Sequence, residues 1–209
     1  MVDYSSNITI NRNNFLLNRD LAIVLDGSLY VEVFNNSINR NNRSGIYLRN
    51  SYNCNLINNS IINNGEGIQL YGSSKNQIFT NDVISSAGDG ILLKGSDYNI
   101  IANNNISFNI LFGINLTNIP GMRCRCDSDE NEIFNNTIHY NQRGSIADQG
   151  VNTNIHDNDC IGEGINTFST SLSLNGISIF FYLLLTKFCL FYKKKLSFGE
   201  HLRTIRKDN

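Results

Sequence analysis

Two acidic side chains stand at equivalent positions 23 residues apart, because Glu66 and Asp89 each precede a Gly-Ile pair. If the chain stacks with that period, the two carboxylates lie side by side, about 5 Å apart along the stack. A neighbouring carboxylate pair can supply a general acid and a general base for catalysis. Glu66 and Asp89 are therefore the acid/base candidates of this chain. The alternative interpretation is a solvated strand edge with ordinary charges.

A second group of chemically capable side chains lies in the segment 118–130. Met122, Cys124 and Cys126 offer sulfur ligands of the kind that Cu(I) prefers. Asp127 and Asp129 offer oxygen ligands suited to Ca²⁺. The third interpretation is a solvated excursion with a redox-sensitive thiol pair. We expect no resident cofactor, and the copper and calcium alternatives stay open.

A repeat must position these side chains. The pattern N-x-I-x-x-N-x-I/V occurs at 76–83, 99–106 and 131–138. Its second asparagine recurs at steps of 22 or 23 residues, with one step of 32 that marks the segment 118–130 as an insertion. The members of that column are Asn13, Asn36, Asn59, Asn81, Asn104, Asn136 and Asn158. Three further columns share the period: a second asparagine column from Asn18, an Ile column from Ile23 and a Ser column from Ser28.

Each repeat unit holds three short apolar runs separated by Asn, Ser and Gly, which is the signal of strands joined by turns. Three strands in 22–23 residues make one rung of a parallel β-solenoid, in which each strand pairs with its equivalent on the next rung. Asparagine accounts for 36 of the 209 residues. It tolerates the left-handed backbone of corners and can bond to the asparagine of the next rung. The sequence therefore predicts an all-β fold of about seven rungs.

The units 76–96, 99–116 and 131–146 resemble the right-handed parallel β-helix repeats of the NosD-type, carbohydrate-binding and sugar-hydrolase superfamily. The resemblance covers roughly residues 7–160 and implies a right-handed coil. That coil serves lyases, hydrolases, epimerases, adhesins, surface-layer proteins and copper-maturation factors, so it does not imply one function. The motifs of polygalacturonases (NTD, DD, GHG, RIK) and the DPH-type motif of mannuronan epimerases are absent from the chain.

We predict a binding face on the strands that begin at the Gly-Ile pairs, because alternate residues of a strand point outward. Two of its columns contain aromatic, cationic and amide side chains suited to sugars, namely Tyr47, Arg49, Gln69, Tyr71 and Lys94. We therefore expect a non-catalytic cell-surface module that presents a rigid face to a polysaccharide or a surface protein. The alternatives are a polysaccharide lyase, epimerase or hydrolase on the same fold and a NosD-like copper-handling factor. A further apolar column, which starts at Phe34, is either an exposed stripe or, as we expect, turns inward.

The two ends of the chain differ in composition from the repeats. We assign 7–167 to the β-helix and 168–209 to an apolar segment with a basic tail. The run 177–192 is nearly all apolar and is followed by Lys193–Lys195, which fits a membrane anchor with a cytoplasmic tail. A capping helix and a non-native tail are the alternatives.

No leader with the pattern of a signal peptide opens the chain, so we expect an upstream start or a piece of a longer protein. The chain would then be a monomer or part of a larger chain, located outside the cell or on its surface. The 17 basic and 18 acidic residues nearly balance, so we expect no nucleic-acid partner.

Overall fold

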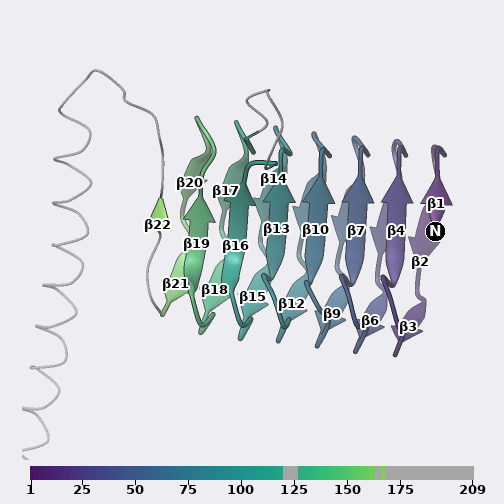
Figure 1. Ribbon diagram of the computed structural model, residues 1–209, viewed down its shortest axis with the longest axis horizontal. Coiled ribbons are helices and arrows are strands. Elements are labelled where there is room, and N and C mark those ends of the chain that lie inside the picture. Colours follow the sequence, from purple (N-terminus) through teal and green to yellow (C-terminus); the bar gives the residue numbers. More distant parts are fainter. Residues whose placement is uncertain (120–126, 163–165, 168–209) are drawn as a thin grey trace, which may run out of the picture. The chain divides into compact units, whose positions relative to one another are not determined.

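The computed structural model describes residues 1–119, 127–162 and 166–167, and these residues form a right-handed parallel β-helix of seven rungs (Figure 1). Every strand pairs in parallel with its equivalents on the neighbouring rungs, so three parallel sheets run along the rod. The all-β solenoid predicted from the 22–23-residue period is confirmed.

We number the three sheets in the order in which the chain first reaches them, through β1, β2 and β3. Sheet 1 consists of β1 (Val2–Asp3), β4 (Ile23–Asp26), β7 (Ile46–Arg49), β10 (Ile68–Tyr71), β13 (Ile91–Lys94), β16 (Phe112–Thr117), β19 (Gly144–Asp148) and β22 (Asn166–Thr167). Sheet 2 consists of β2 (Thr9–Asn11), β5 (Glu32–Phe34), β8 (Asn55–Ile57), β11 (Gln77–Phe79), β14 (Ile100–Ala102), β17 (Glu132–Phe134) and β20 (Asn154–His156). Sheet 3 consists of β3 (Asn14–Leu16), β6 (Ser37–Asn39), β9 (Ser60–Ile62), β12 (Asp82–Ile84), β15 (Asn105–Ser107), β18 (Thr137–His139) and β21 (Asp159–Ile161).

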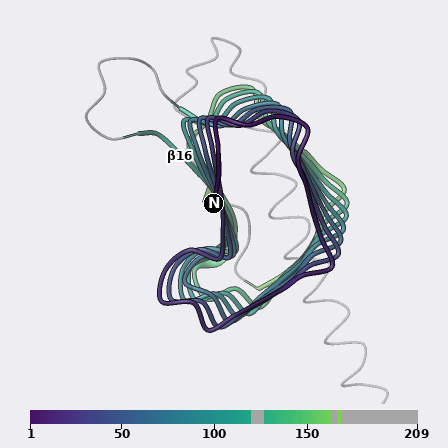
Figure 2. The ribbon, with the colours of Figure 1, turned by 90° about the vertical axis from the view of Figure 1, so that its right-hand side faces the viewer.

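The core is a stack of aliphatic columns inside the coil. Seen along the rod, the rungs superimpose closely and enclose one interior (Figure 2). In the central three-residue strands of sheets 2 and 3 the middle residue is fully buried, as with Ile78 and Val83, while its neighbours point outward. In sheet 1 the first and third residues of β13, Ile91 and Leu93, are fully buried in the same way. Side chains that alternate between inside and outside make every outward column a regular row along the rod.

The corners use the left-handed backbone that asparagine tolerates. Four corner columns have positive φ on successive rungs, with Asn35, Asn58 and Thr80 in one of them at φ values of 56°, 54° and 53°. The next residue in that corner turns inward and forms a ladder, in which Asn59 Nδ2 donates to Asn81 Oδ1 at 3.0 Å. The first predicted asparagine column continues this ladder.

The second predicted asparagine column has side-chain links from Asn41 to Asn64 and from Asn109 to Asn141. It is interrupted at Ser86, whose buried Oγ has no hydrogen-bond partner within the described residues. In the Ser column the backbone N–H of one serine donates to the Oγ of the next.

A third asparagine ladder is present that the sequence reasoning did not separate. The Nδ2 of Asn76 donates to Asn99 Oδ1 at 3.1 Å, and Asn99 Nδ2 donates to Asn131 Oδ1 at 3.1 Å. Its equivalent position on the preceding rung holds Cys54, whose backbone N–H donates to Asn76 Oδ1 at 2.9 Å. The inward asparagines at these corners therefore satisfy buried backbone groups.

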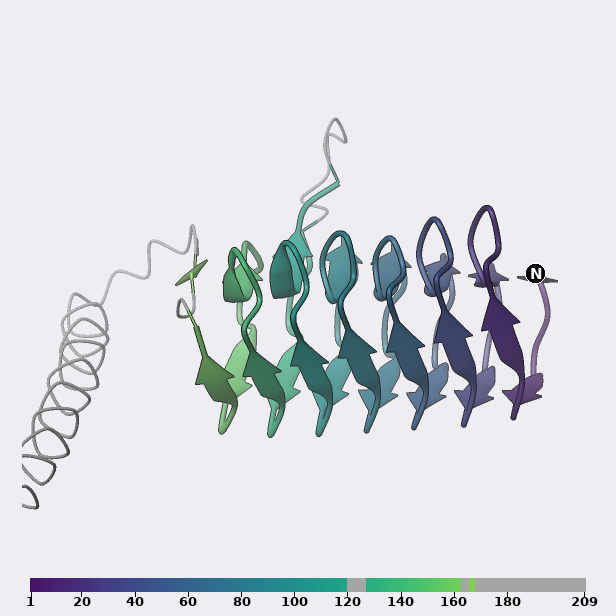
Figure 3. The same cartoon turned by 90° about the horizontal axis from the view of Figure 1, so that it is seen from below.

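The insertion leaves the solenoid after β16 and returns by Ser128. The backbone N–H of Ser96 donates to Ser128 Oγ at 3.2 Å, which continues the Ser ladder across the 32-residue step. Residues Asp129 and Glu130 then occupy regular rung positions beside Asp97 and Tyr98. The excursion is therefore shorter than the predicted 118–130. Seen from below, the rungs on either side of it keep the same spacing (Figure 3).

One expectation about the outward columns is wrong. The column that starts at Phe34 does not turn inward, because the middle residue of each sheet 2 strand takes the inward place. Phe34 and Phe79 are half-buried and Ile57 is exposed, so this column lies on the outer face of sheet 2. The run 177–192 and its proposed anchor lie outside the described residues. Within the described ranges, the structure has no helix long and apolar enough to span a bilayer.

Candidate functional site

The five side chains predicted as a binding face lie together on three adjacent rungs of sheet 1. Strand register pairs Tyr47 with Gln69 and pairs Arg49 with Tyr71, and Tyr71 in turn pairs with Lys94. The residues between them in β7, β10 and β13 are buried leucines, so the five side chains point outward. We call this group the sheet 1 face.

Arg49 is held in place by a buried carboxylate. Its Nε donates to Asp26 Oδ1 at 2.9 Å and its Nη2 bonds to Asp26 Oδ2, which makes the pair bidentate. Asp26 is 4% exposed, whereas half of the Arg49 side chain is exposed. The hydrogen bond from Arg49 lowers the pKa of Asp26, and the same pair raises the pKa of Arg49. The guanidinium is therefore presented in a fixed orientation, with part of its charge neutralised.

The aromatic and cationic members give the face its chemistry. Tyr47 is half-buried, and burial raises its pKa above the ordinary value of 10.0, so its phenol is neutral near pH 7. Tyr71 and Lys94 are half-buried on the next two rungs. In the described part of the chain, no carboxylate pairs with the Lys94 ammonium within 4 Å. Rings with polar tips beside cations suit a ligand with both apolar ring faces and negative groups.

The carboxylates Glu66 and Asp89 lie on adjacent rungs at the edge of this face. The backbone N–H of Gly45 donates to Glu66 O at 2.9 Å and that of Gly67 donates to Asp89 O at 3.1 Å, which fixes both in one column. Glu66 is half-buried, and its Oε2 lies 3.4 Å from the Ser44 hydroxyl. That hydroxyl lies 2.9 Å from Gln69 Oε1, so this edge is continuous with the sheet 1 face.

Asp89 is buried and fully engaged. It is 4% exposed; its Oδ1 accepts the backbone N–H of Phe112 at 2.9 Å, and its Oδ2 accepts Asn115 Nδ2 at 3.0 Å. Burial raises the pKa of Asp89, the two hydrogen bonds oppose that shift, and the charge of Glu66 adds to it. The side chain therefore braces the next rung, and Glu66 is the more accessible carboxylate of the pair.

The predicted metal ligands separate into two parts. Met122, Cys124 and Cys126 lie outside the described residues. Asp129 is part of a regular rung: its N–H donates to Asp97 Oδ1 at 2.9 Å, and its own Oδ1 accepts the Val151 N–H at 2.7 Å. Burial raises the pKa of Asp97, and the charges of Asp129, Glu130 and Asp127 add to that shift. Among residues 1–119, 127–162 and 166–167, no three His, Cys, Asp or Glu side chains gather in a way that could hold a metal ion.

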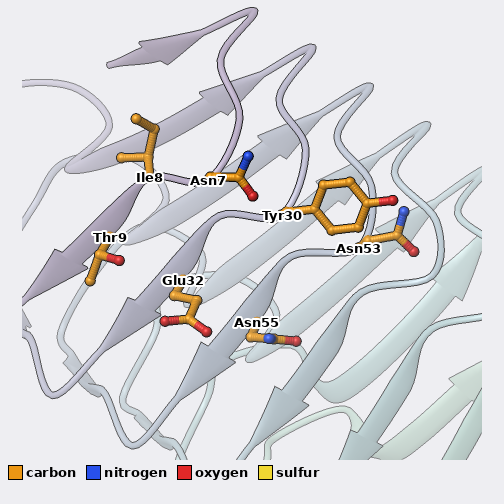
Figure 4. Close-up of a pocket in the computed structure, with 7 residues that line it drawn as sticks. All are labelled: Asn7, Ile8, Thr9, Tyr30, Glu32, Asn53 and Asn55. Atoms are coloured by element: carbon orange, nitrogen blue, oxygen red, sulfur yellow. The ribbon is translucent and has the colours of Figure 1, made fainter.

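A shallow hollow of about 340 Å³ on the outer surface was missed by the sequence reasoning (Figure 4). It lies between a left-handed corner column and the first outward column of sheet 2, over three rungs. Its lining residues are Asn7, Ile8, Thr9, Tyr30, Glu32, Asn53 and Asn55. The 23-residue period places these columns side by side, but their members differ in type, so no motif marks them.

Comparison with known proteins identifies the family. The family model described as periplasmic copper-binding protein (NosD) matches residues 1–86 and, in a second overlapping match, 39–175. The chain belongs to the NosD family. No curated protein sequence matches this NosD-family chain.

Solved structures similar to this NosD-family chain share its fold. The periplasmic alginate epimerase AlgG superimposes with a TM-score of 0.66 at 19% identity, over 81% of this chain and 42% of that one. The enzymatically active domain of tailspike protein 2 of bacteriophage CBA120 superimposes with a TM-score of 0.56 at 13% identity, over 78% of this chain and 26% of that one. The chain thus spans less than half the length of either protein, and at these identities the likeness shows the β-helix alone.

Proposed function

We propose that this NosD-family chain is a carbohydrate-binding β-helix module whose sheet 1 face binds an acidic polysaccharide outside the cytoplasm. The observation that carries the proposal is the placement of Tyr47 and Tyr71 beside Arg49, Lys94 and Gln69 on three consecutive rungs. The rungs are roughly 4.8 Å apart, so the face is a flat, rigid row of side chains along which an extended chain can lie.

The chemistry of the face supports an acidic glycan over a neutral one. Tyrosine rings stack on the apolar faces of sugars and offer a hydroxyl at the rim. Arg49 and Lys94 attract carboxylates, while Gln69 bonds to hydroxyls. The alginate epimerase with the same fold is named for an acidic polysaccharide and described as periplasmic. That description and the periplasmic description of the NosD family support a location outside the cytoplasm.

The geometry favours binding over catalysis. An acid/base mechanism needs two carboxyl groups that both reach the substrate. Asp89 is 4% exposed and both of its oxygens accept hydrogen bonds from the next rung, so it is poorly placed to touch a sugar. Glu66 is left as a single carboxylate beside the face.

The test is affinity for a polyuronate such as alginate, measured by calorimetry at low salt. We expect the double variant Tyr47→Ala/Tyr71→Ala to weaken binding about tenfold, since each stacked ring contributes about 0.5–1.5 kcal/mol. Lys94→Met should weaken binding and reduce its salt dependence. Tyr98→Asn, at an exposed tyrosine in a different column, is the control, because asparagine accepts the φ of +55° there. Absence of binding to every acidic and neutral polymer tried would overturn the proposal.

A second candidate function is a polysaccharide lyase, epimerase or hydrolase. The observation in its favour is that Glu66 and Asp89 lie in one column on adjacent rungs and that burial raises the pKa of Asp89, as a general acid requires. Uronate polymers incubated with the protein, with and without Ca²⁺, should then be cleaved or epimerised. Glu66→Gln should abolish that turnover, and an unchanged rate in this variant would remove Glu66 from the mechanism.

Copper binding is a third candidate function, because the family is described as a periplasmic copper-binding protein. The described residues do not fit a copper site, because they gather no suitable set of three ligands. The sulfur ligands Met122, Cys124 and Cys126 lie outside those residues. Titration of Cu(I) into the wild type and into Cys124→Ser/Cys126→Ser tests this alternative, and an equal stoichiometry in both would remove it.

A further inference from the structure

Four polar side chains that line the hollow beside sheet 2 have no partner of their own. The side chains of Tyr30, Glu32, Asn53 and Asn55 make no hydrogen bond or ion pair within the described residues. This differs from the inward asparagines, whose amides are consumed by ladders. The donors and acceptors of these four side chains are therefore free to bond to a ligand in the hollow.

The same two columns carry engaged side chains further along the rod. Tyr98 is the equivalent of Tyr30 in the corner column, and the carboxylate of Glu130, one rung away, raises the pKa of Tyr98. Glu132 is the equivalent of Glu32 in the strand column, and its Oε1 lies 3.6 Å from His156 Nε2. Only at the hollow, among the described rungs, do a tyrosine and a glutamate of these columns stand close together without such partners.

The shape and composition of the hollow match a sugar. Its volume of about 340 Å³ is at the lower end of the roughly 300–1,000 Å³ of small-molecule sites. Tyr30 is 56% exposed, and its ring extends from the corner toward Asn53 at the edge of the hollow, so it offers a stacking surface (Figure 4). The Glu32 carboxylate and the amides of Asn53 and Asn55 offer the acceptors and donors that ring hydroxyls need.

The charge of the hollow selects among sugars. Glu32 is the one charged side chain among the lining residues, and no Lys, Arg or His of the described chain pairs with it. A uronate would meet an uncompensated carboxylate there, whereas a hydroxyl or an ammonium group would donate to it. This preference is opposite to that of the sheet 1 face.

We propose that this hollow is a second saccharide site, which binds a neutral or amino sugar through stacking on Tyr30 and hydrogen bonds to Glu32, Asn53 and Asn55. The site uses different side chains, on a different face of the rod, from those of the sheet 1 face. The chain would then contact two kinds of sugar at once, an acidic polymer on sheet 1 and a neutral or basic unit beside sheet 2.

The experiment is an amide-resolved NMR titration with cellobiose, the glucosamine disaccharide and digalacturonate as separate probes. We expect cellobiose and the glucosamine disaccharide to shift the amides of 7–9, 30–32 and 53–55, and digalacturonate to leave them unchanged. Tyr30→Asn is the test variant, because asparagine accepts the φ of +54° at this corner. It should weaken binding about tenfold, a loss typical of a stacking surface and its hydroxyl.

Matched controls come from the same columns. Tyr98→Asn replaces an exposed tyrosine at a φ of +55°, and Glu132→Gln neutralises the equivalent glutamate, so both should leave the affinity unchanged. Glu32→Gln should weaken the glucosamine disaccharide more than cellobiose. No shift at the hollow with either probe, an equal loss in Tyr98→Asn, or a preference for digalacturonate would each overturn the proposal. Tyr47→Ala/Tyr71→Ala should keep this binding, so its outcome is separate from that of the sheet 1 face.

Discussion

The asparagine ladder through Asn81 gives the sharpest test of how this solenoid is held together. Asn81 is fully buried, and its Oδ1 accepts the backbone N–H and the Nδ2 of Asn59 at 2.9 and 3.0 Å. Its Nδ2 donates to Leu56 O, Phe79 O and Asn104 Oδ1 at 2.9–3.0 Å. Asn81→Ala removes these five contacts. On the preceding rung the backbone N–H and Nδ2 of Asn59 and the carbonyl of Leu56 each lose a buried bond, whereas Asn104 Oδ1 on the next rung keeps the backbone N–H of residue 81.

The cost follows from those unpaired groups. Each buried polar group left without a partner costs about 1–3 kcal/mol, and two or three such groups give about 3–5 kcal/mol. For a chain of this size that loss lowers Tm by roughly 10 °C. The assay is urea and thermal unfolding followed by circular dichroism, with an unchanged m-value as the check that the rod still unfolds as a unit.

The matched control is Gln77→Ala on the same rung. Gln77 is exposed and its side chain makes no hydrogen bond within the described residues, so this variant should cost less than about 0.5 kcal/mol. If Asn81→Ala were no more destabilising than Gln77→Ala, the ladder would not stabilise the corners and our reasoning about it would be refuted.

Three further predictions concern packing and charge. Gly67→Ala should destabilise the protein by about 1–3 kcal/mol in urea unfolding, because an added Cβ would lie 2.2 Å from the Val83 side chain; a neutral result would contradict this packing. Burial raises the pKa of Asp89 above 3.8, so the folded state holds that proton more tightly and stability falls as the pH rises above this value. In Asp89→Asn the fall should be smaller, and an unchanged pH profile would exclude this contribution. Arg49→Met should raise the pKa of the Asp26 carboxyl in an NMR titration, since Arg49 holds it down; an unmoved pKa would rule out the ion pair in solution.

The inward half of the molecule could be predicted from the sequence for a physical reason. Every inward position has the same surroundings on each rung, so the same residue type is selected again at 22–23 residues. The columns through Asn59, Ile68 and Ser73 were readable for this reason. The third asparagine ladder was less visible because its column holds Ile8, Val31 and Cys54 on the first three rungs and asparagine only from Asn76 onward.

For the outward side chains, the sequence predicts where each one lies on the rod but not its burial or its contacts. The period placed Glu66 and Asp89 in one column, but the burial of Asp89 depends on Phe112 and Asn115 of the next rung, which no repeat specifies. Because Phe34 is apolar, its column is expected to turn into the core. Strand alternation decides otherwise, because the preceding residue, Val33, already takes the inward place.

Function in a solenoid is therefore best sought by comparing rungs within one outward column. Tyr30 and Tyr98 occupy the same column with the same backbone, and they differ in the neighbour that stacking places beside them. The Glu130 carboxylate raises the pKa of Tyr98, whereas Asn53 and Glu32 border a hollow with Tyr30, whose hydroxyl makes no hydrogen bond within the described residues. Because the scaffold around both tyrosines is the same, a difference in ligand binding between Tyr30→Asn and Tyr98→Asn can be assigned to those neighbours and not to the fold.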